Sequence, residues 1–441
     1  MSLALRTWWV APTLLIGLLA ALLPTSNAAF SNPTSNDGNA FQTRQPIRVT
    51  TYQIPAGAFT GTTYTLTLNQ DLATDYFVIL RGGAGNNTGS GTVGPNADYA
   101  RVSGDPFGTG GLTDLTGNAA LELTRGANTH SWQGQVTVLE SPDSQATAGF
   151  TLLDVAQVTF TDASTTGAVA ISQPWGSGAS RVGLYGGSYG GGVQTVAAAA
   201  GDHMTAWGRI YPTDSNVVNV QRRAGGGGAI NFTTTFTVYA VEWGAEWTIQ
   251  RRTITGTAGG QGANNPWEYN TTAIASVVRE NTFVVASGRS ADNGIGDGFE
   301  GAIWTLGNGV SQNTNETTVA LGSEYTDWRQ AEIYVHEHPR IFVEYDFGTD
   351  GGSGIPNGAL TGTQAVSNPQ GPESRSGHTT AGYRFALISN TSNGQGTAYP
   401  RPLAWARHTA DATITWTRSR SGQPGAYWMQ SVDFGGLWAA P

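Results

Sequence analysis

Neither cysteine nor lysine occurs in the 441-residue sequence. Without cysteine the chain cannot form disulfides, and without lysine it cannot form Lys–Asn isopeptide cross-links. All 22 basic residues are therefore arginine. Charged residues make up only 12% of the chain, which is about half of the usual share. The stability of the fold must consequently come from buried apolar side chains and backbone hydrogen bonds.

Aromatic residues are plentiful, with 14 Trp, 15 Tyr and 15 Phe. A disordered chain would combine high charge with few aromatics, so this composition predicts a folded protein with sizeable cores. The net charge is −9, and the arginines do not cluster in a basic run. Both features argue against a nucleic acid as the partner.

The first 28 residues have the pattern of a secretory signal peptide. Arg6 supplies a positive start, an apolar stretch runs from Trp8 to Leu23, and small residues follow at Ser26–Ala28. We expect removal of residues 1–28 and export, so that the mature protein is extracellular or at the cell surface with no membrane span. A retained membrane anchor is the alternative. Residues 29–46 are polar and are expected to form a flexible arm.

From Ile47 onward, apolar and polar residues alternate with a period of two. Tyr64–Leu68 and Phe236–Val241 are examples. Such alternation between clusters of Gly, Asn and Asp is typical of β-strands. Two segments, Thr195–Ala200 and Thr272–Arg279, are candidates for short helical turns.

An internal repeat of about 100 residues organises the sequence. Each copy has a short apolar strand, a segment with Ala and an aromatic, an alternating strand that ends in Arg, and a strand that ends in an acid. The apolar strands are Phe77–Leu80, Val182–Tyr185, Phe283–Ala286 and Phe385–Ile388. The Ala segments are Tyr99–Arg101, Ala206–Arg209, Ala302–Trp304 and Ala404–Arg407. The Arg strands are Leu121–Arg125, Val218–Arg222 and Ile414–Arg418, and the third copy has Val319–Ser323 without Arg. The acid strands are Val136–Glu140, Val238–Glu242, Ile333–Glu337 and Met429–Asp433.

Each copy also opens with a strand, which gives roughly six strands in about 100 residues. The opening strands are Ile47–Tyr52, Phe150–Val155, Trp247–Arg251 and Ile341–Tyr345. Two antiparallel sheets that bury their apolar faces against each other satisfy this pattern. The sequence therefore predicts an all-β protein of four tandem antiparallel β-sandwich units at 47–147, 148–245, 246–340 and 341–441. Whether the units are separate domains or pack together stays open.

The unit resembles the tandem β-sandwich repeats of bacterial surface proteins and phage tail proteins. The residues that carry this resemblance are Val241-Glu242-Trp243, followed after a short turn by Trp247–Arg251. The layout is also similar to the six-stranded sandwich of H-type lectins. The resemblance spans about residues 47–434, and it implies a role in binding or in fibre formation.

The repeated Arg and acid predict structural salt bridges between neighbouring strands. The expected pairs are Arg125 with Glu140, Arg222 with Glu242, and Arg418 with Asp433. A ligand-binding or acid-catalytic role is the alternative. A fold-defining pair recurs in every copy by construction, whereas a catalytic site rarely does, so we expect no catalytic residue here.

Metal and carbohydrate sites are further candidates. The oxygen-rich loop at Asp292, Asn293, Asp297 and Glu300 is a candidate calcium site, and we expect no other cofactor. His336 and His338 would face the same way on a strand, as metal ligands do, but no further ligands are evident. Sugars stack on exposed aromatic rings, and the candidates beside loops are Trp175, Tyr185, Tyr189, Trp267, Tyr269 and Trp328.

Motifs for catalysis are weak. Gly186–Gly190 has the spacing of a nucleophile elbow but lacks the strand-to-helix setting. Glu242 and Glu246 lie near a turn, with nothing to place them across a cleft.

We therefore expect a non-catalytic structural or adhesive protein that assembles into fibres or an outer layer, by self-association or by contact with other surface proteins. Few charges protect its strand edges, and the arm could add a strand to a neighbouring copy. A carbohydrate-binding array is the alternative, and an enzyme acting on polysaccharide is a third, less favoured reading.

Overall fold

The computed structural model describes most of the chain after residue 45. The described ranges are 46–85, 95–117, 119–143, 147–161, 164–176, 180–186, 192–194, 206–222, 233–255, 268–290, 301–308, 313–323, 328–348, 355–356, 359–366, 383–391, 404–410, 412–419 and 425–438. The chain divides into two compact units, residues 1–44 and 45–441, and all of the described residues belong to the second. The predicted signal peptide and nearly all of the arm lie outside the described residues. In the described part of the chain, no helix has the length and apolar character needed to cross a membrane.

The prediction of an all-β fold is confirmed. The sheets are antiparallel apart from one short parallel contact, between β4 and β5. Thr272–Arg279, which was expected to turn helically, is instead mostly part of a strand (β16), because its backbone pairs with a neighbouring strand and its Thr, Ile and Val side chains suit that conformation. The helices described are short: α2 (Pro95–Asp98), η2 (Thr109–Gly111), η5 (Arg279–Asn281) and η6 (Gly435–Trp438).

The strands fall into four sets that follow one another along the chain. Set 1 has β1 (Arg48–Ile54), β2 (Thr63–Thr67), β3 (Tyr76–Gly85), β4 (Arg101–Asp105), β5 (Thr113–Asp114), β6 (Ala120–Thr124) and β7 (Ser131–Glu140). Set 2 has β8 (Phe150–Phe160), β9 (Thr166–Ala170), β10 (Val182–Tyr185), β11 (Val193–Gln194), β12 (Gly208–Thr213), β13 (Val217–Arg222) and β14 (Thr234–Trp243). Set 3 has β15 (Thr248–Thr255), β16 (Glu268–Val278), β17 (Thr282–Ser290), β18 (Gly301–Leu306), β19 (Asn315–Ser323) and β20 (Trp328–Glu337). Set 4 has β21 (Phe342–Gly348), β22 (Thr361–Ala365), β23 (Arg384–Thr391), β24 (Ala404–Ala410), β25 (Thr413–Arg418) and β26 (Tyr427–Asp433).

One pairing order recurs in every set. The inner sheets have the orders β1-β7-β3, β8-β14-β10, β15-β20-β17 and β21-β26-β23. The outer sheets have the orders β2-β6-β4, β9-β13-β12, β16-β19-β18 and β22-β25-β24. Within each set, the first, third and last strands therefore form one sheet, and the remaining three principal strands form the other.

The four sets contact one another in a closed ring. Arg101 of set 1 donates to Gln157 and Thr237 of set 2, and the backbone N–H of Ile210 in set 2 donates to Ser287 of set 3. Strand β18 of set 3 pairs with β23 of set 4, which joins two sheets into one of six strands. A fourth contact closes the ring.

This fourth contact links set 1 with set 4, which are the first and the last sets along the chain. The side-chain amide of Gln135 in set 1 donates to the backbone carbonyl of Ala406 in set 4, at 2.9 Å, and both residues are buried. The four sets therefore form one body, and not four separate domains on a string.

The inner sheets meet at a central core. In the last strand of each set, the residue before the repeated acid is Leu139, Val241, His336 or Val432. The residues that pair with them, from β3, β10, β17 and β23, are Phe77, Gly183, Phe283 and Phe385, respectively. A Cβ on Gly183 would lie 2.1 Å from the hydroxyl oxygen of Tyr185, so Tyr185 fills the space that the glycine leaves. Its ring stacks on Phe77 with centroids 4.3 Å apart.

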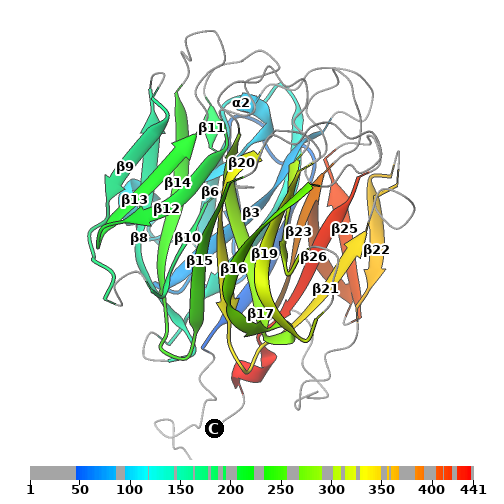
Figure 1. Ribbon diagram of the computed structural model, residues 1–441. Coiled ribbons are helices and arrows are strands. Elements are labelled where there is room, and N and C mark those ends of the chain that lie inside the picture. Colours follow the sequence, from blue (N-terminus) through cyan, green and yellow to red (C-terminus); the bar gives the residue numbers. More distant parts are fainter. Residues whose placement is uncertain are drawn as a thin grey trace, which may run out of the picture. The chain divides into compact units, whose positions relative to one another are not determined.

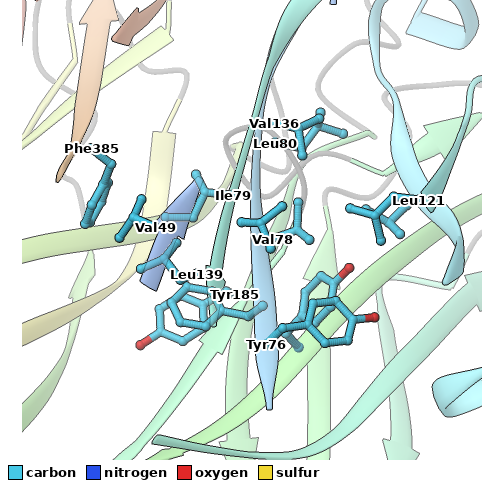
Figure 2. Close-up of a cluster of buried hydrophobic side chains, with 14 of the residues drawn as sticks. Val49, Tyr76, Val78, Ile79, Leu80, Leu121, Val136, Leu139, Tyr185 and Phe385 are labelled. Atoms are coloured by element: carbon cyan, nitrogen blue, oxygen red, sulfur yellow. The ribbon is translucent and has the colours of Figure 1, made fainter. Parts of the chain in front are cut away.

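The side chains of β3 contact two different layers of the core. In Figure 2, Ile79 lies on the side of Val49 and Phe385, whereas Val78 lies on the side of Leu121 from β6. Set 1 thus packs its own two sheets together on one face of β3 and joins the central core on the other.

The body has two distinct ends. Each set begins and finishes at one end, because Arg48 pairs with Glu140, Phe150 with Trp243, Thr248 with Glu337 and Phe342 with Asp433. We call this end the base; η6, after the last strand, lies there at the bottom of Figure 1. The opposite end, where β3, β10, β17 and β23 finish, is the crown, with α2 at the top of Figure 1.

Candidate functional site

The three Arg–acid pairs expected from the sequence do not form. Arg222 donates to Thr234 at the start of β14, whereas Glu242 is near the end of the same strand. Eight residues of strand separate the two positions, or about 26 Å. The reason is topological: the Arg ends one strand of a connected antiparallel pair and the acid ends the next, so the Arg lies at the crown and the acid at the base.

At the crown, each repeated Arg fastens the connection between the first two strands of its set. The backbone N–H groups of Arg125, Arg222 and Arg418 donate to the carbonyls of Thr62, Thr165 and Leu360, respectively. This bond recurs at the same place in all three sets, just before β2, β9 and β22.

The Arg side chains hold the same region. Arg222 donates to the Ser164 carbonyl at 3.0 Å, and Arg418 to the carbonyls of Ala359 and Pro356. Arg125 instead donates to the His130 carbonyl at 2.6 Å.

Burial lowers the pKa of both Arg125 and Arg418 to about 10. Both guanidinium groups are therefore still charged at neutral pH, and their bonds to carbonyls are charge-assisted and strong. Arg125 and Arg222 also lie over the rings of Phe59 and Phe160, at 5.0 and 4.3 Å from the centroids. The repeated Arg is thus a loop anchor that caps the core of its set.

At the base, the repeated acids fasten the connection between the second and third strands. Glu140 accepts from the backbone N–H of Ala73, Glu242 from Gly176 and Glu337 from Val278. Asp433 differs, because it accepts from the backbone N–H of Gly435, two residues further along the chain.

Arginines that the sequence analysis did not single out are the ionic partners of these acids. Arg48 donates to Glu140 at 2.8 Å, and Arg384 donates to Asp433 at 2.6 Å. Burial raises the pKa of Asp433, although Arg384 opposes that shift. Pairing the predicted opening strand Ile47–Tyr52 with Val136–Glu140 could have found the first pair, since it sets Arg48 opposite Glu140.

The segments that link the sets meet at the base. Glu246, between sets 2 and 3, accepts from Thr147 between sets 1 and 2 and from Arg340 between sets 3 and 4. The hydrogen bond from Thr147, followed by Arg340, lowers the pKa of Glu246. His338, which is fully buried beside the Trp247 ring, has its pKa lowered to about 4 by burial and by Arg340.

A second polar group lies inside the central core. The indole N–H of Trp243 donates to the hydroxyl of Tyr185 at 2.6 Å, and that hydroxyl is 2.6 Å from Nε2 of His336. The hydroxyl has one hydrogen and two lone pairs, so either Tyr185 or His336 can be the donor in this second bond. Burial lowers the pKa of His336 to about 3, so the imidazole is neutral at neutral pH.

Two of the candidate glycan-binding aromatics are not on the surface. Trp175 is 4% exposed and donates to the Asp214 carbonyl, and Tyr185 is 2% exposed in the central core. The expectation that they face solvent is wrong, because both pack against strands of the scaffold. The side chains of Tyr189, Trp267, Tyr269 and Trp328 lie outside the described residues.

The calcium candidates Asp292, Asn293, Asp297 and Glu300 also lie outside the described residues. Among the residues that are described, no three His, Asp or Glu side chains gather as metal ligands. His336 and His338 have separate surroundings: His336 contacts Tyr185 and Phe283, and His338 contacts Trp247 and Glu246. The repeated charges of the described chain therefore hold loops and join strand sets.

No protein-family model, curated protein sequence or solved structure matches this chain.

Proposed function

We propose that this chain is an exported, non-catalytic adhesive protein of a cell or virion surface. Four β-sandwich units, at 47–147, 148–245, 246–340 and 341–441, would form its rigid body. The recurring strand order supports this division, as do the anchors that recur with it: Arg at the crown in three sets, and an acid at the base in all four.

The polarity of the body carries the proposal. The first strand begins and the last strand ends at the base, at the opposite end of the body from the crown. Strands β3, β10, β17 and β23 finish at the crown, and the sequence segments that follow them are long and rich in Gly, Ser and Asn. Rigid β-scaffolds that present loops at one end are a common design for binding proteins.

The contacts of the repeated Arg and acid residues favour a binding role over a catalytic one. The repeated Arg residues lie against backbone carbonyls, and the repeated acids accept backbone N–H groups or bind Arg. Groups engaged in this way stabilise loop positions. None of the anchoring groups described is thereby left as an unpaired acid or base of the kind that catalysis uses.

Two insertions that flank the same strand test the proposal. A flexible Gly/Ser segment is inserted after Gly396, in the sequence between the crown ends of β23 and β24, or after Ala410, the last residue of β24, at the base. Binding of the labelled chain is measured on a printed glycan array and on an array of extracellular-matrix proteins. We expect the crown insertion to weaken binding at least about tenfold, while the base insertion leaves it unchanged.

Equal loss for both insertions would contradict a crown-directed contact. An uninserted chain that binds to nothing on either array would refute the adhesive role. Binding confined to the glycan array would identify the contact as carbohydrate recognition.

A further inference from the structure

Each outer sheet of the ring ends in a strand that pairs on one side only among the described residues. These outer edges are β2, β9, β16 and β22. An unpaired edge exposes a row of backbone N–H and C=O groups that can pair with another chain. The outer edges are therefore the natural place to look for a contact between copies.

Two of these edges have no charge and only modest side chains. The sequence of β9 is Thr-Gly-Ala-Val-Ala, and that of β22 is Thr-Gly-Thr-Gln-Ala. In both, exposed and half-buried residues alternate, so one face packs on the set and the other meets solvent. The exposed positions hold only Thr and Ala.

The edges of the inner sheets contrast with these two. Their first strands all carry charge: Arg48 in β1, Asp154 in β8, Arg251 and Arg252 in β15, and Glu344 and Asp346 in β21. Charges on an edge are the usual protection against edge-to-edge pairing. The first-strand edges of the inner sheets are thus protected by charge, whereas β9 and β22 are not.

The ring places β9 and β22 on opposite sides. They belong to sets 2 and 4, which are separated by set 1 on one side and by set 3 on the other, and Figure 1 shows them at the two lateral extremes of the body. The other opposed pair differs, because β2 is uncharged but β16 begins with Glu268. Only one line across the ring therefore has an uncharged edge at both ends.

We propose that β9 of one copy pairs with β22 of the next, so that a second copy of this chain is the partner of both edges. A contact between two different edges is heterologous, and because the two edges lie on opposite sides of the body, we infer that it continues from copy to copy as an open chain. The molecule already contains a junction of this kind, because β18 and β23 join two sheets into one of six strands. This inference does not depend on what the crown binds.

Two double variants with the same positions and opposite charge patterns test it. Ala168 is at the centre of β9 and Thr363 at the centre of β22, and both are exposed. In A168E/T363E like charges meet across the contact, and in A168E/T363R opposite charges meet. Association of the full chain is measured by light scattering over a hundredfold concentration range, and chains are viewed by electron microscopy.

We expect open chains for the natural sequence and for A168E/T363R, and about fivefold weaker association for A168E/T363E. The control T255E adds an acid to an exposed position of β15, an edge that already carries Arg251 and Arg252, and should associate normally. Circular dichroism melts check that each variant is folded.

Three results would overturn the proposal: a natural chain that stays monomeric at every concentration, association that stops at dimers, or two double variants that behave alike. If both double variants associate weakly, β9 pairs with β9, since A168E then repels itself in both, and if both associate normally, the contact lies at neither edge. If β9 and β22 prove not to pair, the proposal for the crown still stands. The insertions are tested by binding to the arrays, whereas the pairing is tested by the mass of the assemblies in light scattering.

Discussion

His336 makes the stability of this protein depend on acid in a calculable way. It is fully buried, and burial lowers its pKa from 6.5 to about 3. In the unfolded chain it is protonated below about pH 6.5, whereas in the folded protein it stays neutral down to about pH 3. Its contribution to the free energy of unfolding is therefore fully present above pH 6.5 and is lost as the pH falls toward 3. Between about pH 7.5 and pH 5, this one residue should cost about 2 kcal/mol.

The surroundings of His336 explain why its pKa is lowered in the folded protein. Among the described residues its hydrogen-bonding side-chain partner is the Tyr185 hydroxyl, a neutral group that cannot balance an imidazolium charge. The remaining neighbours are rings: Phe283 stacks at 4.4 Å, and Trp243 and Tyr334 lie near it. They offer no carboxylate to balance a charge.

The assay compares urea unfolding at the two pH values, followed by tryptophan fluorescence. The variant H336L places an apolar residue where the other three sets have Leu139, Val241 and Val432. We expect it to lose about 2 kcal/mol less than the natural chain on acidification. His338 titrates in both proteins and cancels in the comparison.

The matched control is F283L, which removes the stacked ring but no titratable group. It should lower the stability by a similar amount at both pH values, since its effect is packing alone. If H336L and the natural chain showed the same loss between the two pH values, the assignment of a buried neutral imidazole at the ring centre would be refuted.

Three further changes probe the anchors and the ring by thermal melts and urea unfolding. R222A should cost about 2–4 kcal/mol, since it removes charge-assisted bonds to buried groups, whereas R407A, at an exposed Arg, should change stability by less than about 0.5 kcal/mol; equal effects would contradict the anchor role. G110A should cost about 3 kcal/mol or more, because its Cβ would lie 1.5 Å from a backbone oxygen of set 2, while G57A, at a positive φ in open space, should cost only about 1 kcal/mol. Q135A should cost about 1–3 kcal/mol, because it leaves a buried carbonyl of set 4 unpaired; an unchanged melting temperature would argue against a stabilising ring closure.

The positions of many strands could be predicted from the sequence, but the contacts between strands could not. Period-two alternation located the strands at Phe77–Leu80 and Val238–Glu242, because one face of each is buried. The expected pairing of Arg222 with Glu242 was wrong, because spacing along the chain does not tell which end of a strand a residue occupies. The strand order supplies that information, and it depends on backbone pairing.

Contacts between the sets left no pattern in the sequence. Gln135 and Ala406 are 271 residues apart, and a single hydrogen bond from a Gln has no recognisable spacing. Trp175 looked like a loop aromatic, but its indole reaches a carbonyl in a neighbouring turn and the ring is buried. In both cases the deciding partner comes from tertiary packing, which local composition does not encode.

Gly183 and Tyr185 show what becomes possible when all four strand sets of the ring belong to one chain. A homotetramer built around an axis must repeat each solution to its central packing four times. Here three positions on that axis have phenylalanine, and the fourth has lost its side chain to make room for a tyrosine reaching in from two residues away. Unlike a homotetramer, a single polypeptide can place one histidine and one tyrosine among otherwise apolar equivalents, so its four quarters can diverge without losing their common centre.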